Sequence, residues 1–334
     1  MKMRDFGEAA LVSAFSEIYH SHPGIEVGIG DDAAVVEPLS PRQIVTTDMA
    51  SDGVHFNRQW STGRDIGAKI AIANLADIYA MGGKPVLAIA ILGWPVSKLA
   101  PEIAAEVLNG AREICSKANI PLAGGHSIDS PEPIFGLAVN GLAGINNLRQ
   151  NNTAKSGDLL FMTKPLGFGM VTTAAKRNLA DIEHLQKAIE LMTTVNEIGQ
   201  ILGSVKGVHA LTDVTGFGLL GHLIEMAEGS GLTAYIEFDK VPSLAGLEKY
   251  ISGFIYPDMT MKNYSTYADK VNELSPEQLF VCCDPQTSGG LLVAVAPGSV
   301  NEYLNAIKGS QAESYASVPV GYLSDKSEKV VIIK

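Results

Sequence analysis

Positive charge is scarce in this chain. Its 334 residues carry 25 Lys and Arg against 36 Asp and Glu, which gives a formal net charge of −11. A protein that binds nucleic acid or an anionic membrane non-specifically needs a basic face, so we expect neither partner. The net charge does not exclude a small anionic ligand such as a nucleotide, because metal ions and backbone amides can hold it.

Cysteine and long apolar runs are also scarce. The chain has three Cys residues, Cys115, Cys282 and Cys283, with no CxxC pair and no even set. This pattern is typical of a reducing cytoplasm rather than of a disulfide framework. No stretch reaches the roughly 18 apolar residues of a membrane span, and the first residues lack the apolar core of a signal peptide. We therefore expect a cytoplasmic protein.

Several familiar catalytic motifs are missing. The sequence contains no HxxxH, HExxH, GxSxG or Walker A pattern. These patterns mark zinc sites, α/β-hydrolase nucleophiles and phosphate-binding P-loops. Zinc proteases, α/β-hydrolases and P-loop enzymes are therefore disfavoured.

What remains is the composition of a globular protein, with 46% apolar and 18% charged residues. The length suggests two domains, each large enough to bury its own core. Strands and helices alternate in both halves with mixed hydrophobic periods, which predicts an α+β or α/β class. The polar, turn-rich stretch 146–157 separates the halves. We predict an N-terminal domain at 1–150 and a C-terminal domain at 151–334.

One predicted helix, at residues 70–83, carries two unexpected polar side chains. Gly82 and Gly83 give it a clear C-terminal stop. Asn74 and Asp77 lie three residues apart in its apolar run and therefore share one face. A carboxylate in such a setting is costly unless something charged meets it.

Aspartates recur where predicted strands give way to turns. The set consists of Asp31, Asp32, Asp48 and Asp213, to which the helix adds Asp77. Carboxylates gathered around one point repel one another unless cations lie between them, and Mg²⁺ takes oxygen ligands and bridges phosphates. The set predicts a metal-nucleotide site. Any single one could instead be a turn former or helix cap.

The stretch 216–221 fits the G-x-G-x-x-G pattern after a strand and before a helix. Asp213, just before it, would repel a pyrophosphate unless a metal intervened. We favour Asp213 as a metal ligand, with glycines that let the backbone turn tightly. NAD binding stays a weaker alternative.

Residues 124–129, reading Gly-Gly-His-Ser-Ile-Asp, could offer backbone amides to phosphate oxygens. They could equally form a turn at a strand end. His126 could act as a base, although a lone His is more often structural. The stretches 164–167 and 284–290 are also turn-rich, with a Lys and hydroxyls that could touch a ligand.

Long strings between residues 77 and 296 resemble the selenophosphate synthetases (selenide, water dikinases). These enzymes share a superfamily with thiamine-monophosphate kinase and aminoimidazole ribonucleotide synthetase. The strings are DIYAMGGKP (77–85), ILGWP (91–95), GGHSID (124–129), PEPIFGLAV (131–139), TKPLG (163–167), TDVTGFGLLGH (212–222) and DPQTSGG (284–290). Strings of this length are highly specific.

The first 70 residues differ and resemble thiamine-monophosphate kinase more closely. The strings that carry this likeness are GIGDDAA (28–34), TTD (46–48) and DGVHF (52–56), followed by Trp60. Selenophosphate synthetases also carry a glycine-rich loop with a reactive Cys or selenocysteine and a Lys before their Asp-Asp motif. Here 30 residues precede Asp31, none is a Cys, and Lys2 is the sole Lys.

The resemblance implies two α+β domains in an aminoimidazole ribonucleotide synthetase-like fold, a homodimer paired through the N-terminal domains, and Mg-ATP held by aspartates. Carried over by position, the metal ligands are Asp32, Asp48, Asp77 and Asp213, to which we add Asp31. The nucleotide contacts are Asp48, Gly124, Gly125 and His126. No catalytic residue is predicted.

We therefore predict an ATP-dependent phosphotransferase acting on a small molecule, most similar to selenophosphate synthetase. That enzyme converts selenide, ATP and water to selenophosphate, orthophosphate and AMP. Thiamine-monophosphate kinase is the first alternative, although that family has an Asp where this chain has His126. A nucleotide-binding protein that lacks acceptor chemistry is the second.

Overall fold

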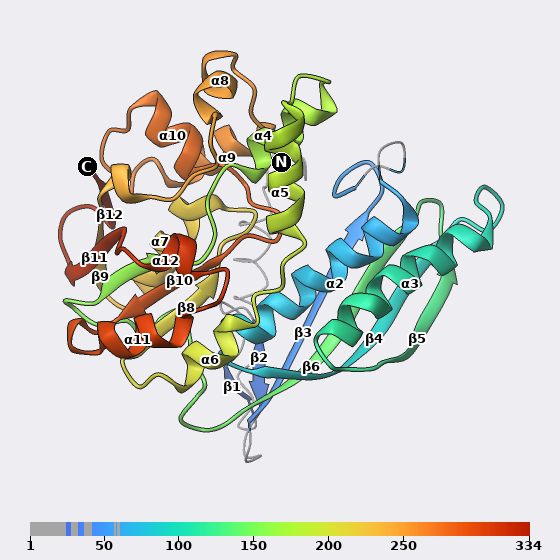
Figure 1. Ribbon diagram of the computed structural model, residues 1–334, viewed down its shortest axis with the longest axis horizontal. Helices are drawn as coiled ribbons and strands as arrows, with labels where there is room; N and C mark the ends of the chain where they lie inside the picture. Colours follow the sequence, from blue (N-terminus) through green and yellow to red (C-terminus); the bar gives the residue numbers. More distant parts are fainter. Residues whose placement is uncertain (1–24, 28–32, 37–41, 57, 59–60) are drawn as a thin grey trace, which may run out of the picture.

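The computed structural model describes residues 25–27, 33–36, 42–56, 58 and 61–334. Figure 1 shows two units side by side, each built on one sheet with helices packed against it. Among these residues each sheet has six strands. The predicted α+β class is confirmed. Within the described residues, no helix combines the length and apolar character that crossing a membrane requires.

The first sheet belongs to the N-terminal part of the chain. Its strands are β1 (Ile25–Val27), β2 (Ala34–Val36), β3 (Arg42–Ser51), β4 (Lys84–Trp94), β5 (Leu122–Asp129) and β6 (Ile134–Ala143). They lie in the order β1-β2-β3-β6-β4-β5. Neighbours are antiparallel except for the parallel pair β4 and β5.

Helices α2 (Gly63–Ala80) and α3 (Pro101–Lys117) cover one face of this sheet (Figure 1). They approach closely at two glycines. A Cβ on Gly67 would lie 1.8 Å from the Val107 carbonyl oxygen, and one on Gly110 would lie 2.0 Å from the Arg64 carbonyl oxygen. Larger residues would force the helices apart.

Helix α2 begins at a capping box, because the Asp65 N–H donates to Thr62 Oγ1 and the Thr62 N–H donates back to Asp65 Oδ2. It ends at Ala80, and Gly82 follows with a φ of +69°. The helix predicted at 70–83 is thus confirmed, with an earlier start. Its last turn contacts the second unit as well as the first sheet, so side chains are buried around most of the helix.

The second sheet contains β7 (Leu159–Met162), β8 (Val208–Asp213), β9 (Leu232–Ile236), β10 (Leu291–Val295), β11 (Gly321–Asp325) and β12 (Val331–Ile333). Their order is β12-β9-β11-β7-β10-β8. All five residues of β10 are buried, so this strand runs through the core. The predicted domain boundary at 150/151 lies between β6 and β7, and it stays a prediction.

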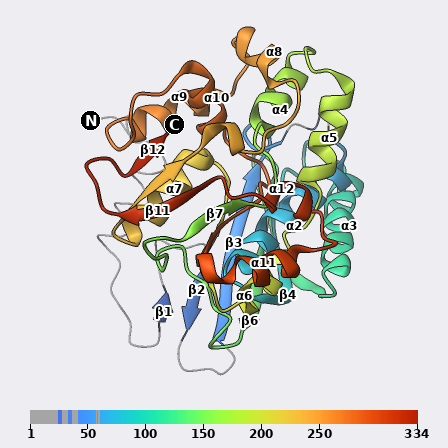
Figure 2. The ribbon, with the colours of Figure 1, turned by 60° about the vertical axis from the view of Figure 1, so that its left-hand side comes forward.

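The helices of the second unit surround its sheet (Figure 2). They are α4 (Phe168–Lys176), α5 (Ile182–Met192), α6 (Ile198–Ser204), α7 (Gly218–Gly229), α8 (Leu247–Ser252), α9 (Asp258–Tyr267), α10 (Pro276–Cys282), α11 (Val300–Ile307) and α12 (Glu313–Ala316). Ala80 of α2 packs into a core cluster with Phe161 and Leu202. The end of α2 is therefore part of both units.

Residues 124–129, which the sequence allowed to be a turn, are instead part of strand β5. Gly125 pairs with Ala90 of β4. Its φ is +154°, and an added Cβ would lie 2.0 Å from the Ala90 carbonyl oxygen. The glycine pair permits a close approach between strands, and this requirement produces the same sequence signal as a turn.

Candidate functional site

Three aspartates come together where the last turn of α2 meets the second unit. Asp48 lies near the end of β3, Asp77 in α2, and Asp213 at the end of β8. Helix α2 contacts both β3 and β8. The charges of Asp213 and Asp48 both act on the Asp77 carboxyl. We call these three residues the acidic cluster; they are three of the five predicted metal ligands.

Asp77 is the most constrained member of the acidic cluster. Thr46 Oγ1 donates a hydrogen bond of 2.5 Å to its Oδ2. Burial raises the pKa of the Asp77 carboxyl well above its usual range, the nearby charges of Asp213 and Asp48 raise it further, and the bond from Thr46 opposes the rise. The cluster is thus a place where a cation would be stabilised.

Asn74, the other polar residue of the helix, holds the backbone of Asp48. Its Oδ1 accepts the Asp48 N–H at 2.7 Å, and its Nδ2 donates to the Asp48 carbonyl at 3.3 Å and to the Ile70 carbonyl at 2.8 Å. Asn74 is fully buried. It therefore fixes β3 against α2 at the position that presents Asp48.

Asp213 is buried and leads into a loop that is fixed on several sides. The Val214 N–H donates to the Gly290 carbonyl at 2.8 Å, and the Gln286 N–H donates to the Thr215 carbonyl at 2.9 Å. The Thr215 N–H donates to His222 Nε2 at 3.1 Å. Because Nε2 accepts, the His222 proton lies on Nδ1. The glycine motif at 216–221 therefore serves a tight turn between β8 and α7.

Lys164 is a buried cation near Asp213 that sequence reasoning left among possible ligand contacts. Its Nζ donates to the Thr194 carbonyl at 2.8 Å and to the Ser288 carbonyl at 3.0 Å. Burial lowers the pKa of Lys164 to about 7, and the charge of Asp213 opposes this fall. Its ammonium group would partly balance the acidic cluster.

Asp284 is a buried carboxylate that holds the start of α4. Its Oδ2 accepts the Gly169 N–H at 2.9 Å and the Gln286 Nε2 at 2.8 Å. Its Oδ1 is buried without a hydrogen-bond partner among the described residues. Burial raises the pKa of Asp284 to about 8. The stretch 284–290 therefore anchors the start of α4.

The predicted nucleotide contacts at 124–126 lie on the edge strand β5, three strands from β3. His126 pairs with Ile91, Ile91 with Gly136, and Gly136 with Met49. Side chains in one such row point to the same face, and Asp48, one residue from Met49, points to the other. The structure therefore places the His126 side chain on the opposite face of the sheet from Asp48.

Gly125 lies in the same row as Asp48, through Ala90 and Leu137. Three strand spacings separate them, which is about 14 Å. Gly124 and Gly125 are exposed. They do not join the acidic cluster directly. The remaining predicted ligands, Asp31 and Asp32, lie outside the described residues.

The acidic cluster offers the oxygen ligands that Mg²⁺ prefers. Among the residues that the structure describes, however, no group of three or more His, Cys, Asp or Glu is arranged so that it could hold a metal ion by itself. The like charges that raise the pKa of Asp77 fit a cation at this point. The five metal ligands stay a prediction.

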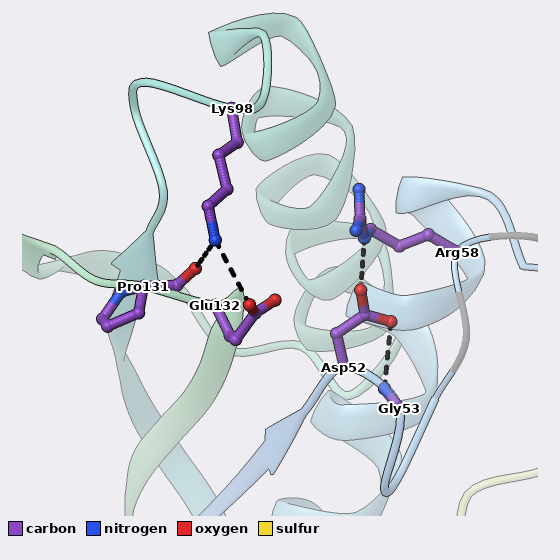
Figure 3. Close-up of polar contacts among 6 residues, drawn as sticks. All are labelled: Asp52, Gly53, Arg58, Lys98, Pro131 and Glu132. Carbon is purple, nitrogen blue, oxygen red and sulfur yellow. Dashed lines mark hydrogen bonds and ion pairs between the residues drawn. The ribbon is translucent and has the colours of Figure 1, made fainter.

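Two ion pairs fix the loops at the end of the first sheet (Figure 3). Arg58 Nε lies 2.5 Å from Asp52 Oδ2. Lys98 Nζ donates to the Pro131 carbonyl at 2.8 Å and lies 3.3 Å from Glu132 Oε1. In both pairs, opposite charges meet directly.

Lys69 is a further residue that sequence reasoning missed, although a Lys in an apolar helix is a usable signal. It lies on α2, and its Nζ donates to the His55 carbonyl at 2.6 Å. Burial, and then the charge of Lys176, lower the pKa of Lys69 to about 8. Beside the buried Lys164, it is a second cation with a lowered pKa, and it is half-buried.

Comparison with protein families divides the chain in two. Residues 30–143 match the N-terminal domain of the AIR synthase related proteins. Residues 155–334 match the C-terminal domain of the same family.

Individual relatives refine this result. The chain is 54% identical over 269 residues to a selenide, water dikinase from Colwellia psychrerythraea, covering 80% of this chain and 76% of the relative. It is 50% identical over 284 residues to one from Escherichia coli O6:H1, covering 85% and 79%. The crystal structure of a thiamine-monophosphate kinase from Aquifex aeolicus superposes with a TM-score of 0.73 at 18% identity, covering 100% and 98%.

Proposed function

We propose that this chain is an ATP-dependent phosphotransferase whose acceptor is selenide. The chain belongs to the AIR synthase related protein family and, within it, to the selenide, water dikinases. The reaction converts selenide, ATP and water to selenophosphate, orthophosphate and AMP. The observation that carries the proposal is the high identity to selenide, water dikinases over four fifths of the chain.

The acidic cluster supports the proposal from the side of chemistry. Asp48, Asp77 and Asp213, with Asp31 and Asp32, would hold Mg²⁺. When bound, Mg²⁺ supplies charge neutralisation of the phosphate oxygens and alignment of the γ-phosphoryl group. Thr46 orients the Asp77 carboxylate through its 2.5 Å hydrogen bond.

Positioning of the metal ligands would then account for most of the protein's contribution to catalysis, as is general in phosphoryl transfer. Asn74 sets the backbone at Asp48. The hydrogen bonds around 213–216 set the position of Asp213. Lys164 places a buried ammonium group beside Asp213. Four separate elements are thus held to one geometry.

We further propose a homodimer paired through the outer face, the face of the first sheet opposite α2 and α3. Met49 is 56% exposed and Ile128 59% exposed, and both lie on this face with Ile89. Exposed apolar patches of this kind mark interaction surfaces. His126 lies on the same face, so pairing would also determine which groups His126 can reach.

A cytoplasmic location completes the proposal. Cys115, Cys282 and Cys283 are all free and buried. Burial raises the pKa of Cys115 to about 11 and also raises that of the other two thiols. The three cysteines therefore behave as core residues, as in a reducing compartment.

Phosphorus NMR of the reaction mixture tests the activity. The protein is incubated with Mg-ATP alone, with selenide, and with thiamine monophosphate. We expect selenide-dependent AMP and a selenophosphate signal. Thiamine diphosphate would replace this proposal by the kinase alternative, and ATP binding without any turnover would favour the nucleotide-binding alternative.

A further inference from the structure

A second polar site lies at the junction of the two units, at the start of β8, whereas Asp213 of the acidic cluster lies at the end of that strand. A pocket of about 550 Å³ opens between the segment that follows β6, the end of α6 and the start of β8. Its lining residues are Asn146, Leu148, Arg149, Gln150, Thr153, Lys155, Lys206, Val208 and His209. We call it the junction pocket. Helix α6 lies beside the end of α2 (Figure 1).

The lining of the junction pocket is basic, although the chain as a whole has a net charge of −11. It includes Arg149, Lys155 and Lys206, and no Asp or Glu. In the part of the chain that the structure describes, none of these three cations forms an ion pair. His209, also in the lining, is bound to the buried Asp158 at 2.9 Å. Three cations that form no ion pair among the described residues therefore surround one cavity, and the nearby Asp158 carboxylate is bound by His209 and by the Lys155 backbone N–H at 2.8 Å.

Arg149 is the unusual member, because a buried guanidinium normally faces a carboxylate. It is 9% exposed. Its Nη1 donates to the Asn146 and Leu148 carbonyls and its Nη2 to the Val205 carbonyl, at 2.9 to 3.0 Å. Its Nε is buried and has no acceptor among the described residues. Carbonyl dipoles hold this charge without neutralising it.

The pocket is also rigidly framed. The Arg149 N–H donates to the Met81 carbonyl at 3.0 Å, at the end of α2. Thr153 Oγ1 donates to the His209 carbonyl at 2.7 Å, and the Leu211 N–H donates to the Gln150 carbonyl at 3.2 Å. The segment 149–153 is thereby fixed along β8. Such a frame keeps the cations together rather than letting them spread apart.

We infer that the junction pocket is a binding site for a small phosphate-bearing anion. Two lysines with flexible side chains, beside a fixed arginine that forms no ion pair, are suited to bind phosphate oxygens. The cavity is large enough for orthophosphate or a nucleoside monophosphate. The site is distinct from the acidic cluster, which would repel an anion that carries no metal. The inference does not depend on the reaction proposed above.

Calorimetric titration without Mg²⁺ tests this inference. The probes are inorganic phosphate and AMP, added separately to the full chain. The test variant is Lys155→Glu/Lys206→Glu, which reverses two exposed charges of the pocket. The matched control is Lys117→Glu/Lys308→Glu, which makes the same charge change at exposed positions elsewhere.

We expect the dissociation constant of the bound probe to rise at least about tenfold in the test variant, and less than about twofold in the control. Equal weakening in both variants would overturn the site, because it would reflect net charge alone. So would the absence of any binding of either probe to the unchanged protein.

The choice of probe separates the two sources of phosphate. Tighter binding of AMP than of phosphate assigns the site to a nucleotide, and equal binding assigns it to the phosphate group itself. The variant Asp213→Asn, tested in parallel, separates this site from the proposed catalytic one. Retained binding in Asp213→Asn together with loss in the lysine variant supports the junction pocket, and the reverse pattern refutes it.

Discussion

Two polar groups of opposite charge lie near the C-terminus of α2. In the acidic group, Asp77 meets Asp48 and Asp213, and burial and then these like charges raise the pKa of its carboxyl. In the basic group, the Met81 carbonyl holds the Arg149 backbone, and the cations of the junction pocket have no carboxylate in the pocket lining. Four residues of one helix end separate the two groups.

The difference shows how one apolar helix can serve two polar sites. Each group combines a buried charge, Asp213 in one and Arg149 in the other, with exposed side chains, Asp48 in one and Lys155 and Lys206 in the other. The acidic group is suited to a cation and the basic group to an anion. Changes that remove one charge should therefore affect one group and spare the other.

The largest effect is expected from Asp48→Asn or Asp213→Asn. Either change removes a charge that we assign to Mg²⁺, so turnover in the phosphorus NMR assay should fall about a thousandfold or more. The fold should survive, because Asn has nearly the same shape and relieves repulsion with Asp77. Circular dichroism melting curves check this second point.

A matched control for these variants is Asp325→Asn at the exposed end of β11. It removes the same charge far from α2 and should leave turnover unchanged. Unchanged turnover in Asp48→Asn and Asp213→Asn as well would show that neither residue binds the metal.

The next effect concerns how Asp48 is held. Asn74→Ala removes both bonds to the Asp48 backbone and leaves the N–H of Asp48 without its partner. We expect the free energy of unfolding to fall by about 2 kcal/mol, because a buried N–H loses its acceptor. We also expect the apparent affinity for Mg²⁺ to fall about tenfold to hundredfold, which is the usual effect of removing a residue that positions a metal ligand. Chemical denaturation and Mg²⁺ titration of the activity measure the two effects.

Asn272 provides the control, because it binds a strand in the same way. Its Oδ1 accepts the Ile333 N–H at 2.7 Å and its Nδ2 donates to the Ile333 carbonyl at 3.0 Å. Asn272→Ala should lower stability without changing the Mg²⁺ dependence. If both variants shift that dependence equally, Asn74 contributes only to stability.

The sequence alone predicts part of this site. The apolar run with a clear stop predicts α2, and the oddity of Asp77 within it points to a charged partner. Asp48 and Asp213 stand out because each closes an apolar run in the sequence, although β3 continues past Asp48 to Ser51 in the structure. These inferences rest on local sequence patterns, which can be recognised without the structure.

The rest depends on contacts between distant segments. Asn74 binds a strand 26 residues earlier, so no local pattern reveals its role. His126 lies on the opposite face from Asp48 because β6 and β4 come between β5 and β3 in the sheet, an order the sequence does not state. The junction pocket joins Arg149 to Lys206 only through the packing of α6 and β8.

Asp284 provides the smallest effect and the sharpest test, because burial raises the pKa of its carboxyl without help from a second acid. Burial alone raises its pKa to about 8, whereas Asp77 also feels two neighbouring charges. The folded state therefore keeps the Asp284 proton at a pH where the unfolded chain has lost it. Its contribution to stability is complete below about pH 4 and is lost as the pH rises through 8.

Between pH 7 and 9 this loss amounts to about 1.4 kcal/mol. Asp284→Asn cannot ionise and should flatten that part of the stability curve, while its amide oxygen still accepts the Gly169 N–H. Denaturation at several pH values compares the slopes of the unchanged protein, Asp284→Asn and the exposed control Asp325→Asn. Parallel slopes in all three would mean that Asp284 is ionised in the folded protein, and that burial alone does not raise a carboxyl pKa this far here. The high pKa of Asp77 would then have to come from the charges of Asp213 and Asp48.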